Sequence, residues 1–212
     1  MAGVLPKNFR PAPGRNNWRG AAIPTRSSMQ ELKNRGIKTI INLALDSTRK
    51  QKCRDGSYPR RPCEPMWAKE LGLKYLPVYL GSRPPSNSDW RKIKAAMMEG
   101  NAFIHCTYGA DRTGAIIGRF RLETEPGLDP DETLREAISF GFKPQSHPGY
   151  GKGPDPNRHL RKWMKAGKFE GVRVSSSPQR AVDSLPGGWK PWVFGGGTLF
   201  LILVSAIVRL RR

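Results

Sequence analysis

The residues best suited to chemistry lie in one short run, HCTYGADRTG, at residues 105–114. Cys106 can act as a nucleophile once it is a thiolate. Arg112 follows six residues later, and its planar guanidinium can bind two oxygens of a phosphate at once. The hydroxyl of Thr113 is placed to donate to the sulfur and help it leave. This spacing predicts attack of a cysteine thiolate on phosphorus.

The elements expected around this run suit an anion. An apolar strand is predicted at residues 102–105 and a helix from about residue 113 to 123, and ligand sites of open α/β sheets lie at such strand-to-helix turns. Backbone N–H groups of a loop entering a helix converge on one point. These groups and Arg112 should lower the pKa of Cys106. The residues expected to bind substrate are Thr107, Tyr108, Gly109, which permits the tight turn, and Ala110.

The complete HCxxGxxRTG string resembles the signature loop of the cysteine-based protein tyrosine and dual-specificity phosphatases. Within that superfamily, the chain is similar to the atypical, Siw14-like and related bacterial enzymes over roughly residues 16–145. The resemblance implies a phosphocysteine intermediate, no metal and no other cofactor. It also implies that His105 orients the loop through hydrogen bonds and does not act as a base. The matching segments are WRGAAIP at 18–24, GIKTIINL at 36–43, LGLKY at 71–75, RPPS at 83–86 and RFR at 119–121.

The position of the general acid departs from this family pattern. Family members usually carry an aspartate in the loop corresponding to residues 81–86, but here that loop is GSRPPS. Asp111 lies inside the signature, as in myotubularins and Sac-type lipid phosphatases, so we expect it to protonate the leaving oxygen. The alternative for Asp111 is a structural carboxylate paired with a nearby arginine. Asp46 is a weaker candidate acid, and Arg83 is either a ligand for a second phosphate or a solvated loop residue.

Strands and helices alternate along the part of the chain that contains the signature. This alternation predicts an α/β fold with a central, mostly parallel sheet of four or five strands flanked by helices. The predicted strands are 38–45, 75–80 and 102–105. The predicted helices are 28–35 (opened by a capping box at Ser28 and Glu31), 64–71, 86–99, 113–123, 129–140 (opened by Asp129 and Pro130) and 157–166.

The charge of the chain is large and unevenly distributed. The 212 residues include 37 Lys and Arg against 17 Asp and Glu, a net charge of +20, while 37% hydrophobic residues exclude a chain disordered throughout. Basic and acidic residues number 14 and 3 in residues 1–63, 17 and 13 in 64–170, and 6 and 1 in 171–212. The excess at both ends predicts an anionic surface or polyanionic substrate as partner, and we do not expect nucleic acid.

An apolar segment near the C-terminal end predicts a membrane anchor. Residues 192–208 are uncharged and mostly apolar, and three arginines follow within four residues. Seventeen residues are the short limit for a spanning helix, and a buried C-terminal helix of the domain is the alternative. We therefore expect a basic arm at 1–15, a phosphatase domain at 16–170, a linker at 171–191 and a single-pass helix at 192–210.

These observations together predict a membrane-anchored, cysteine-dependent phosphatase whose catalytic domain lies in the cytoplasm, where a thiolate stays reduced. Its expected substrate is a phosphorylated protein, as for a protein tyrosine or dual-specificity phosphatase. Phosphoinositides or inositol polyphosphates are the first alternative substrates, and an RNA 5′-triphosphate is the second. A phosphate-binding tether without activity is the alternative from another functional class.

Overall fold

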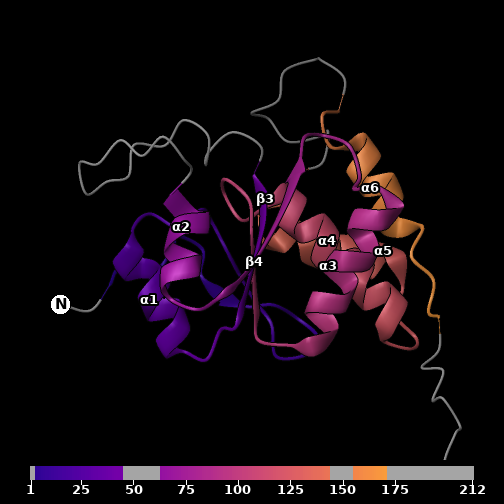
Figure 1. The fold of residues 1–212 in the computed structure, drawn as a ribbon. Helices are drawn as coiled ribbons and strands as arrows, with labels where there is room; N and C mark the ends of the chain where they lie inside the picture. The colour runs from indigo at the N-terminus through magenta and orange to yellow at the C-terminus, as the bar shows by residue number, and fades with distance from the viewer. Residues whose placement is uncertain (1–2, 45–62, 144–154, 171–212) are drawn as a thin grey trace, which may run out of the picture. The chain divides into compact units, whose positions relative to one another are not determined.

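The structure of the protein is a computed structural model, and it describes residues 3–44, 63–143 and 155–170. Its centre is a five-stranded sheet in the order β1-β2-β5-β3-β4. Figure 1 shows β3 and β4 in the middle of the domain, with α1 and α2 to one side and α3 and α4 to the other. Strand β2 pairs parallel with β5, β5 with β3 and β3 with β4, while β1 pairs antiparallel with β2. The predicted α/β class and mostly parallel sheet are confirmed. The strands are β1 (Arg10–Pro11), β2 (Trp18–Gly20), β3 (Thr39–Ala44), β4 (Lys74–Leu80) and β5 (Ala102–His105).

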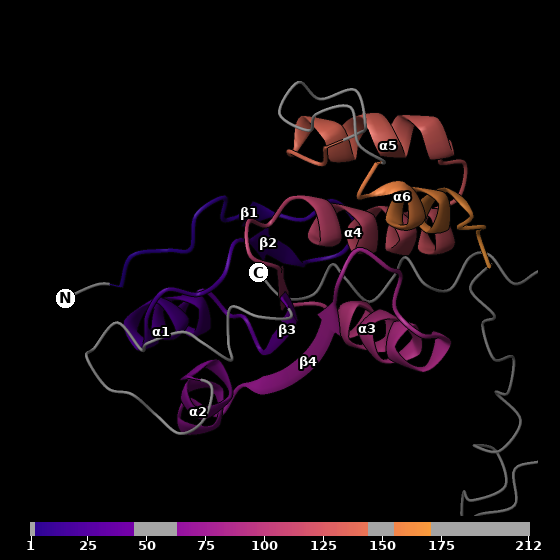
Figure 2. The ribbon, with the colours of Figure 1, turned by 90° about the horizontal axis from the view of Figure 1, so that it is seen from above.

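Helices cover both faces of this sheet (Figure 2). Neighbouring residues of one strand face opposite ways, so Ile40 packs toward α1 and α2 while Ile41 packs toward α3 and α4. Helices α5 and α6 pack on the outer side of α4 through a smaller core around Phe142 and Met164. The helices are α1 (Arg26–Asn34), α2 (Cys63–Glu70), α3 (Asn87–Glu99), α4 (Asp111–Thr124), α5 (Pro130–Ser139) and α6 (Arg158–Lys165).

The start of α1 differs from the prediction by one turn. The expected capping residue Ser28 lies inside the helix, where it is buried and donates its hydroxyl to the Val4 carbonyl. Thr25 is the N-cap, and its hydroxyl accepts from the Ser28 amide at 3.1 Å. Both positions carry a hydroxyl, so sequence spacing alone could not choose between them. The predicted cap Asp129 is confirmed, and Ser86, the predicted first residue of the helix at 86–99, is the N-cap of α3.

The N-terminal residues, from which we predicted no strand, form β1 and β2. They are too short, at two and three residues, for any alternation of apolar and polar residues to appear. Phe9 stacks on Trp18 with ring centroids 4.9 Å apart, and Ala12 is buried in the core. The described part of the predicted arm at residues 1–15 therefore packs against the domain.

The predicted membrane anchor at residues 192–210 lies outside the described residues, as does the predicted linker. Within residues 3–44, 63–143 and 155–170, no helix is both long enough and apolar enough to cross a bilayer.

Candidate active site

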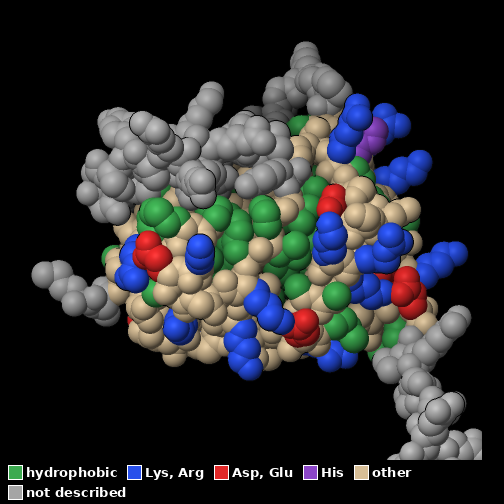
Figure 3. Space-filling model, viewed as in Figure 1, with side chains coloured by type: hydrophobic (Ala, Val, Ile, Leu, Met, Phe, Trp, Pro, Cys, Tyr) green, Lys and Arg blue, Asp and Glu red, His purple; other side chains and the backbone are tan. Residues whose placement is uncertain are grey.

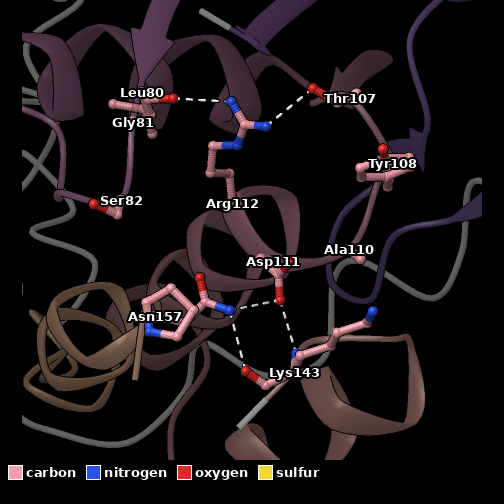
Figure 4. Close-up of a pocket in the computed structure, with 11 residues that line it drawn as sticks. Leu80, Gly81, Ser82, Thr107, Tyr108, Ala110, Asp111, Arg112, Lys143 and Asn157 are labelled. Carbon is pink, nitrogen blue, oxygen red and sulfur yellow. Dashed lines mark hydrogen bonds between the residues drawn. The ribbon is translucent and has the colours of Figure 1, made fainter. Parts of the chain in front are cut away.

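The signature residues surround a cavity at the carboxyl end of β5, where the chain turns into α4. The cavity has a volume of about 640 Å³. Figure 4 shows how Thr107, Asp111 and Arg112 come together there with residues from the end of β4 and from the start of α6. The residues that line it are Leu80, Gly81, Ser82, Thr107, Tyr108, Ala110, Asp111, Arg112, Lys143, Pro156 and Asn157.

The thiol of Cys106 is free and almost completely buried, with 3% of its surface exposed. Burial by itself raises the pKa of a cysteine because it disfavours the charged thiolate. Four other influences outweigh burial and bring the pKa of Cys106 below its ordinary value: the hydroxyl and backbone N–H of Thr113, the charge of Arg112 and the backbone N–H of Tyr108. The buried Thr113 hydroxyl makes no other hydrogen bond of standard geometry, so its proton is available to the sulfur.

The guanidinium of Arg112 is held in place before any substrate binds. Its Nη1 donates to the carbonyl of Leu80 at 2.9 Å and to that of Leu43 at 3.3 Å, at the ends of β4 and β3. Its Nη2 donates to Thr107 Oγ1 at 3.0 Å (Figure 4). Because two parallel strands and the loop itself fix the planar group, little side-chain entropy is lost when it binds a phosphate.

The loop carbonyls point away from the cavity and toward the N-terminal segment. The Ala22 amide donates to Thr107 O at 3.4 Å, Asn8 Nδ2 donates to Tyr108 O at 2.9 Å and Arg19 Nη2 donates to Gly109 O at 2.8 Å. The C=O and N–H of a trans peptide point in opposite directions. The N–H groups of Tyr108, Gly109 and Ala110 are therefore turned to the sulfur side of the loop, as an anion site requires.

Arg19 lies behind the loop, and it was not among the site residues that we predicted from the sequence. It is 1% exposed and lies with its guanidinium carbon 4.9 Å from the ring centroid of Phe140. Burial and the charge of Arg10 lower the pKa of Arg19 to about 10. The only indication in the sequence that Arg19 belongs to the site is its place in the WRGAAIP segment. A single arginine in that segment does not indicate that its side chain is buried.

Gly109 packs so closely on β2 that only glycine fits there. Its φ of +70° is in the left-handed region, and a Cβ at this position would lie 2.4 Å from the backbone carbon and oxygen of Gly20. The predicted need for glycine therefore has a second cause besides the tight turn, namely the close approach of the loop to a strand.

His105 is completely buried and is paired with a carboxylate that the sequence did not indicate. Its Nε2 lies 3.3 Å from Glu64 Oε2, on α2. The same oxygen accepts hydrogen bonds from Asn42 Nδ2 at 2.7 Å and from the Tyr75 hydroxyl at 3.1 Å. Burial lowers the pKa of His105, but the charge and hydrogen bond of Glu64, together with Cys106, raise it above its ordinary value. His105 thus lies where it can support the loop.

Asp111 connects the loop to the start of α6. Its Oδ1 accepts from the Lys143 amide at 2.8 Å and from Asn157 Nδ2 at 2.9 Å (Figure 4). Asn157 also donates to the Lys143 carbonyl at 3.1 Å. Asp111 is the only carboxylate among the described residues that line the cavity, and the structure gives its Oδ2 no hydrogen bond.

The two remaining predicted residues do not form part of the described site. Arg83 is exposed and is absent from the cavity lining. Asp46 lies outside the described residues. Lys143 and Asn157 line the cavity but were not predicted, because they reach it only through the packing of α5 and α6 on α4.

Comparison with known proteins relates most of the described domain to phosphatases. Residues 13–146 match the family described as DSP-PTPase phosphatase fused to NAD+ kinase. The dual specificity protein phosphatase TpbA of Pseudomonas aeruginosa is 21% identical over an alignment of 159 residues, and the match covers 73% of this chain. The chain spans 61% of the length of that relative.

Solved structures share the fold at low sequence identity. The core catalytic domain of the PP-IP phosphatase Siw14 from S. cerevisiae, solved with citrate, has a TM-score of 0.51 at 19% identity. That match covers 81% of this chain and 91% of the Siw14 chain. A phosphatase-like phytase from Bdellovibrio bacteriovorus has a TM-score of 0.54 at 12% identity, covering 78% of this chain and 86% of the other.

Replacing Glu64 with Gln is expected to destabilise the fold most at acidic pH. Because Glu64 raises the pKa of His105, this ion pair stabilises the folded state fully below the unfolded histidine pKa of about 6.5. That stabilisation is lost as pH rises through the higher pKa of the folded state. Urea denaturation should show a loss of about 1–3 kcal/mol at pH 5.5 and a smaller loss at pH 9.

Glu70→Gln is the matched control, because Glu70 pairs with Arg26 on the surface, where both side chains are nearly half exposed. It should change the free energy of unfolding by less than about 0.5 kcal/mol at either pH. An equal loss for Glu64→Gln at both pH values would contradict the assigned ion pair.

Proposed function

This chain belongs to the family of DSP-PTPase phosphatases described as fused to NAD+ kinase, and on that premise we propose that it is a cysteine-dependent phosphatase. The observation that supports the proposal best is the buried Cys106, whose pKa is lowered by Thr113, Arg112 and the loop N–H groups despite burial. A thiolate at the floor of an anion-binding loop is suited to nucleophilic attack on a phosphate monoester.

The proposed reaction has two displacement steps at phosphorus. The Cys106 sulfur forms a bond to phosphorus while the bond from phosphorus to the leaving oxygen breaks, and that oxygen takes up a proton. Water then attacks the phosphocysteine, the sulfur–phosphorus bond breaks and inorganic phosphate is released. Arg112 and the N–H groups of residues 108–110 stabilise the charge on the phosphoryl oxygens in both steps, and Thr113 stabilises the departing thiolate.

The substrate we propose is a phosphorylated protein, with phosphotyrosine as the clearest case. Tyr108 is 72% exposed, and it lines the cavity together with Leu80 and Pro156. Such apolar and aromatic groups suit the ring of a phosphotyrosine side chain. Lys143, which lines the cavity with Arg112, instead favours an inositol polyphosphate or phosphoinositide, whose additional phosphates need a second cation.

Replacing Cys106 with Ser tests the chemistry. A serine hydroxyl is not ionised near neutral pH, so hydrolysis of an aryl phosphate and of a phosphotyrosine peptide should fall by at least about 10³-fold. Phosphate release measured on both substrates checks this, and activity that survives in the variant would overturn the mechanism. Turnover by the unchanged protein would exclude an inactive phosphate-binding tether.

The same assay ranks the substrate classes when phosphoinositide vesicles, an inositol polyphosphate and a 5′-triphosphate RNA are included. We expect the highest kcat/KM for the phosphotyrosine peptide. A higher value for one of the other three would replace the phosphoprotein assignment and leave the thiolate chemistry in place.

We also propose that Asp111 is the general acid. Its Oδ1 is held by Lys143 and Asn157, which leaves Oδ2 to donate a proton to the leaving oxygen. Support comes from its position in the cavity lining and from the lack of any carboxylate in residues 81–86. The alternative is that Asp111 only holds the start of α6 against the loop.

Two substitutions separate these roles of Asp111. Asn can still accept both hydrogen bonds but carries no acidic proton, whereas Ala removes both functions. For an acid, Asp111→Asn should slow single-turnover cleavage of a poor leaving group by about 10²-fold or more and leave an activated aryl phosphate nearly unaffected. If Asp111→Asn behaves like the unchanged protein and only Asp111→Ala is slow, the acid assignment is wrong.

We further propose that residues 192–210 anchor the catalytic domain to a membrane from the cytoplasmic side. The support is the uncharged apolar run at 192–208 and the three arginines that follow it. The double variant Leu201→Lys with Val204→Lys should release the full chain from membranes. Each charge near the centre of a membrane helix costs about 2.5–3.5 kcal/mol on insertion. Fractionation after carbonate washing checks this, with Ser205→Ala as control, and a variant that stays membrane-bound would contradict the anchor.

A further inference from the structure

The outer face of α6, close to the cavity, carries positive charge that the described residues around it neutralise only in part. The helix RHLRKWMK contains four Lys and Arg residues, one histidine and no acidic residue. Leu160 and Met164 are buried in the core, so the charged side chains lie on the outer face. Figure 3 shows Lys and Arg side chains gathered there, at the upper right of that view.

Ion pairs account for only part of this charge. Arg161 is paired with Asp155 at 2.8 Å, and Lys165 is paired with Asp131. Arg158 and Lys162 are both exposed, and the structure gives neither side chain a salt bridge or hydrogen bond within the described residues. These two residues, one turn apart, form what we call the α6 basic pair.

The position of the α6 basic pair is unfavourable for the isolated helix. Arg158 is the first residue of α6, where the helix dipole favours an acidic side chain, and the first turn has none. Like charges four residues apart destabilise a helix by a further few tenths of a kcal/mol. The N-cap Asn157 makes no capping bond, since its side chain donates to Asp111 and Lys143 instead. An anion bound at this position would relieve all three costs.

The α6 basic pair is next to the cavity but outside it. Pro156 and Asn157 line the cavity, whereas Arg158 and Lys162 do not. An extended peptide whose phosphorylated side chain enters the cavity advances about 3.3 Å per residue, so residues two to four positions away lie about 7–13 Å along the surface from the phosphorylated residue.

We propose that the α6 basic pair binds acidic residues that flank the phosphorylated residue of a protein substrate. This inference rests on the proposed phosphatase function and narrows its substrate class to phosphopeptides with nearby Asp or Glu. Arg158 and Lys162 act on substrate binding and take no part in the reaction at phosphorus.

The test uses the full chain and three substrates: a small aryl phosphate, a phosphotyrosine peptide with flanking Glu residues and the same peptide with Gln in their place. At low salt the unchanged protein should favour the Glu peptide about 3–10-fold in kcat/KM, since exposed ion pairs are individually weak. This preference should approach 1 at about 0.5 M salt, where screening is strong.

The double variant Arg158→Glu with Lys162→Glu should lose or reverse the preference and keep hydrolysis of the aryl phosphate within about twofold. The matched control is Lys38→Glu with Lys69→Glu. Both lysines are exposed and lack salt bridges within the described residues, and neither lines the cavity. The control changes the net charge equally and should retain the preference.

Three outcomes would overturn the inference. The first is an unchanged preference in the α6 variant, and the second is an equal loss in the control, which would show a general charge effect. The third is that the α6 variant binds phosphatidylserine vesicles more weakly than the unchanged protein but keeps the same preference between the two peptides, which would assign the pair to a membrane surface.

If the unchanged protein hydrolyses neither peptide, the proposed phosphoprotein function fails. Equal hydrolysis of both peptides overturns the docking inference alone.

Discussion

The site depends on one constraint, which is that a negative charge on Cys106 must be stabilised where water hardly reaches. A buried charge is costly unless hydrogen bonds and opposite charges surround it. Here the compensation comes from Thr113, from Arg112 and from N–H groups on the sulfur side of the loop. Those groups are also suited to a phosphate, so the arrangement that stabilises the thiolate is also suited to binding a phosphoryl group.

Much of the domain serves to keep the loop in this conformation. The N-terminal segment holds the outward carbonyls through Asn8, Arg19 and Ala22, and the ends of β3 and β4 hold the guanidinium of Arg112. Because these donors and acceptors come from separate elements, the loop is fixed from behind and from the side. This explains why two strands as short as β1 and β2 matter for a site about ninety residues later in the chain.

The helices beyond the sheet complete the cavity on the opposite side. Helix α6 packs on α4 through Leu160 and Met164, and the Asp111–Asn157 hydrogen bond joins its start to the loop. One helix can therefore bury an apolar face, line the cavity and present cations beside it. The uneven charge of the chain has a local counterpart here, since Arg158 and Lys162 have no ion pair within the described residues.

The amino-acid sequence by itself determined the glycine turn and the alternation of strands and helices, and it pointed to Cys106 and Arg112 as the nucleophile and the phosphate ligand that we propose, because these features depend on residue type and short spacing. It placed the start of α3 and the cap of α5 correctly but put the start of α1 one turn late, where two hydroxyl residues compete. Only the tertiary structure decided that Glu64 pairs with His105, that Arg19 supports the loop and that Asn157 reaches Asp111. Each of these pairs joins residues more than forty positions apart, which become neighbours only when parallel strands align their ends and helices pack across the sheet.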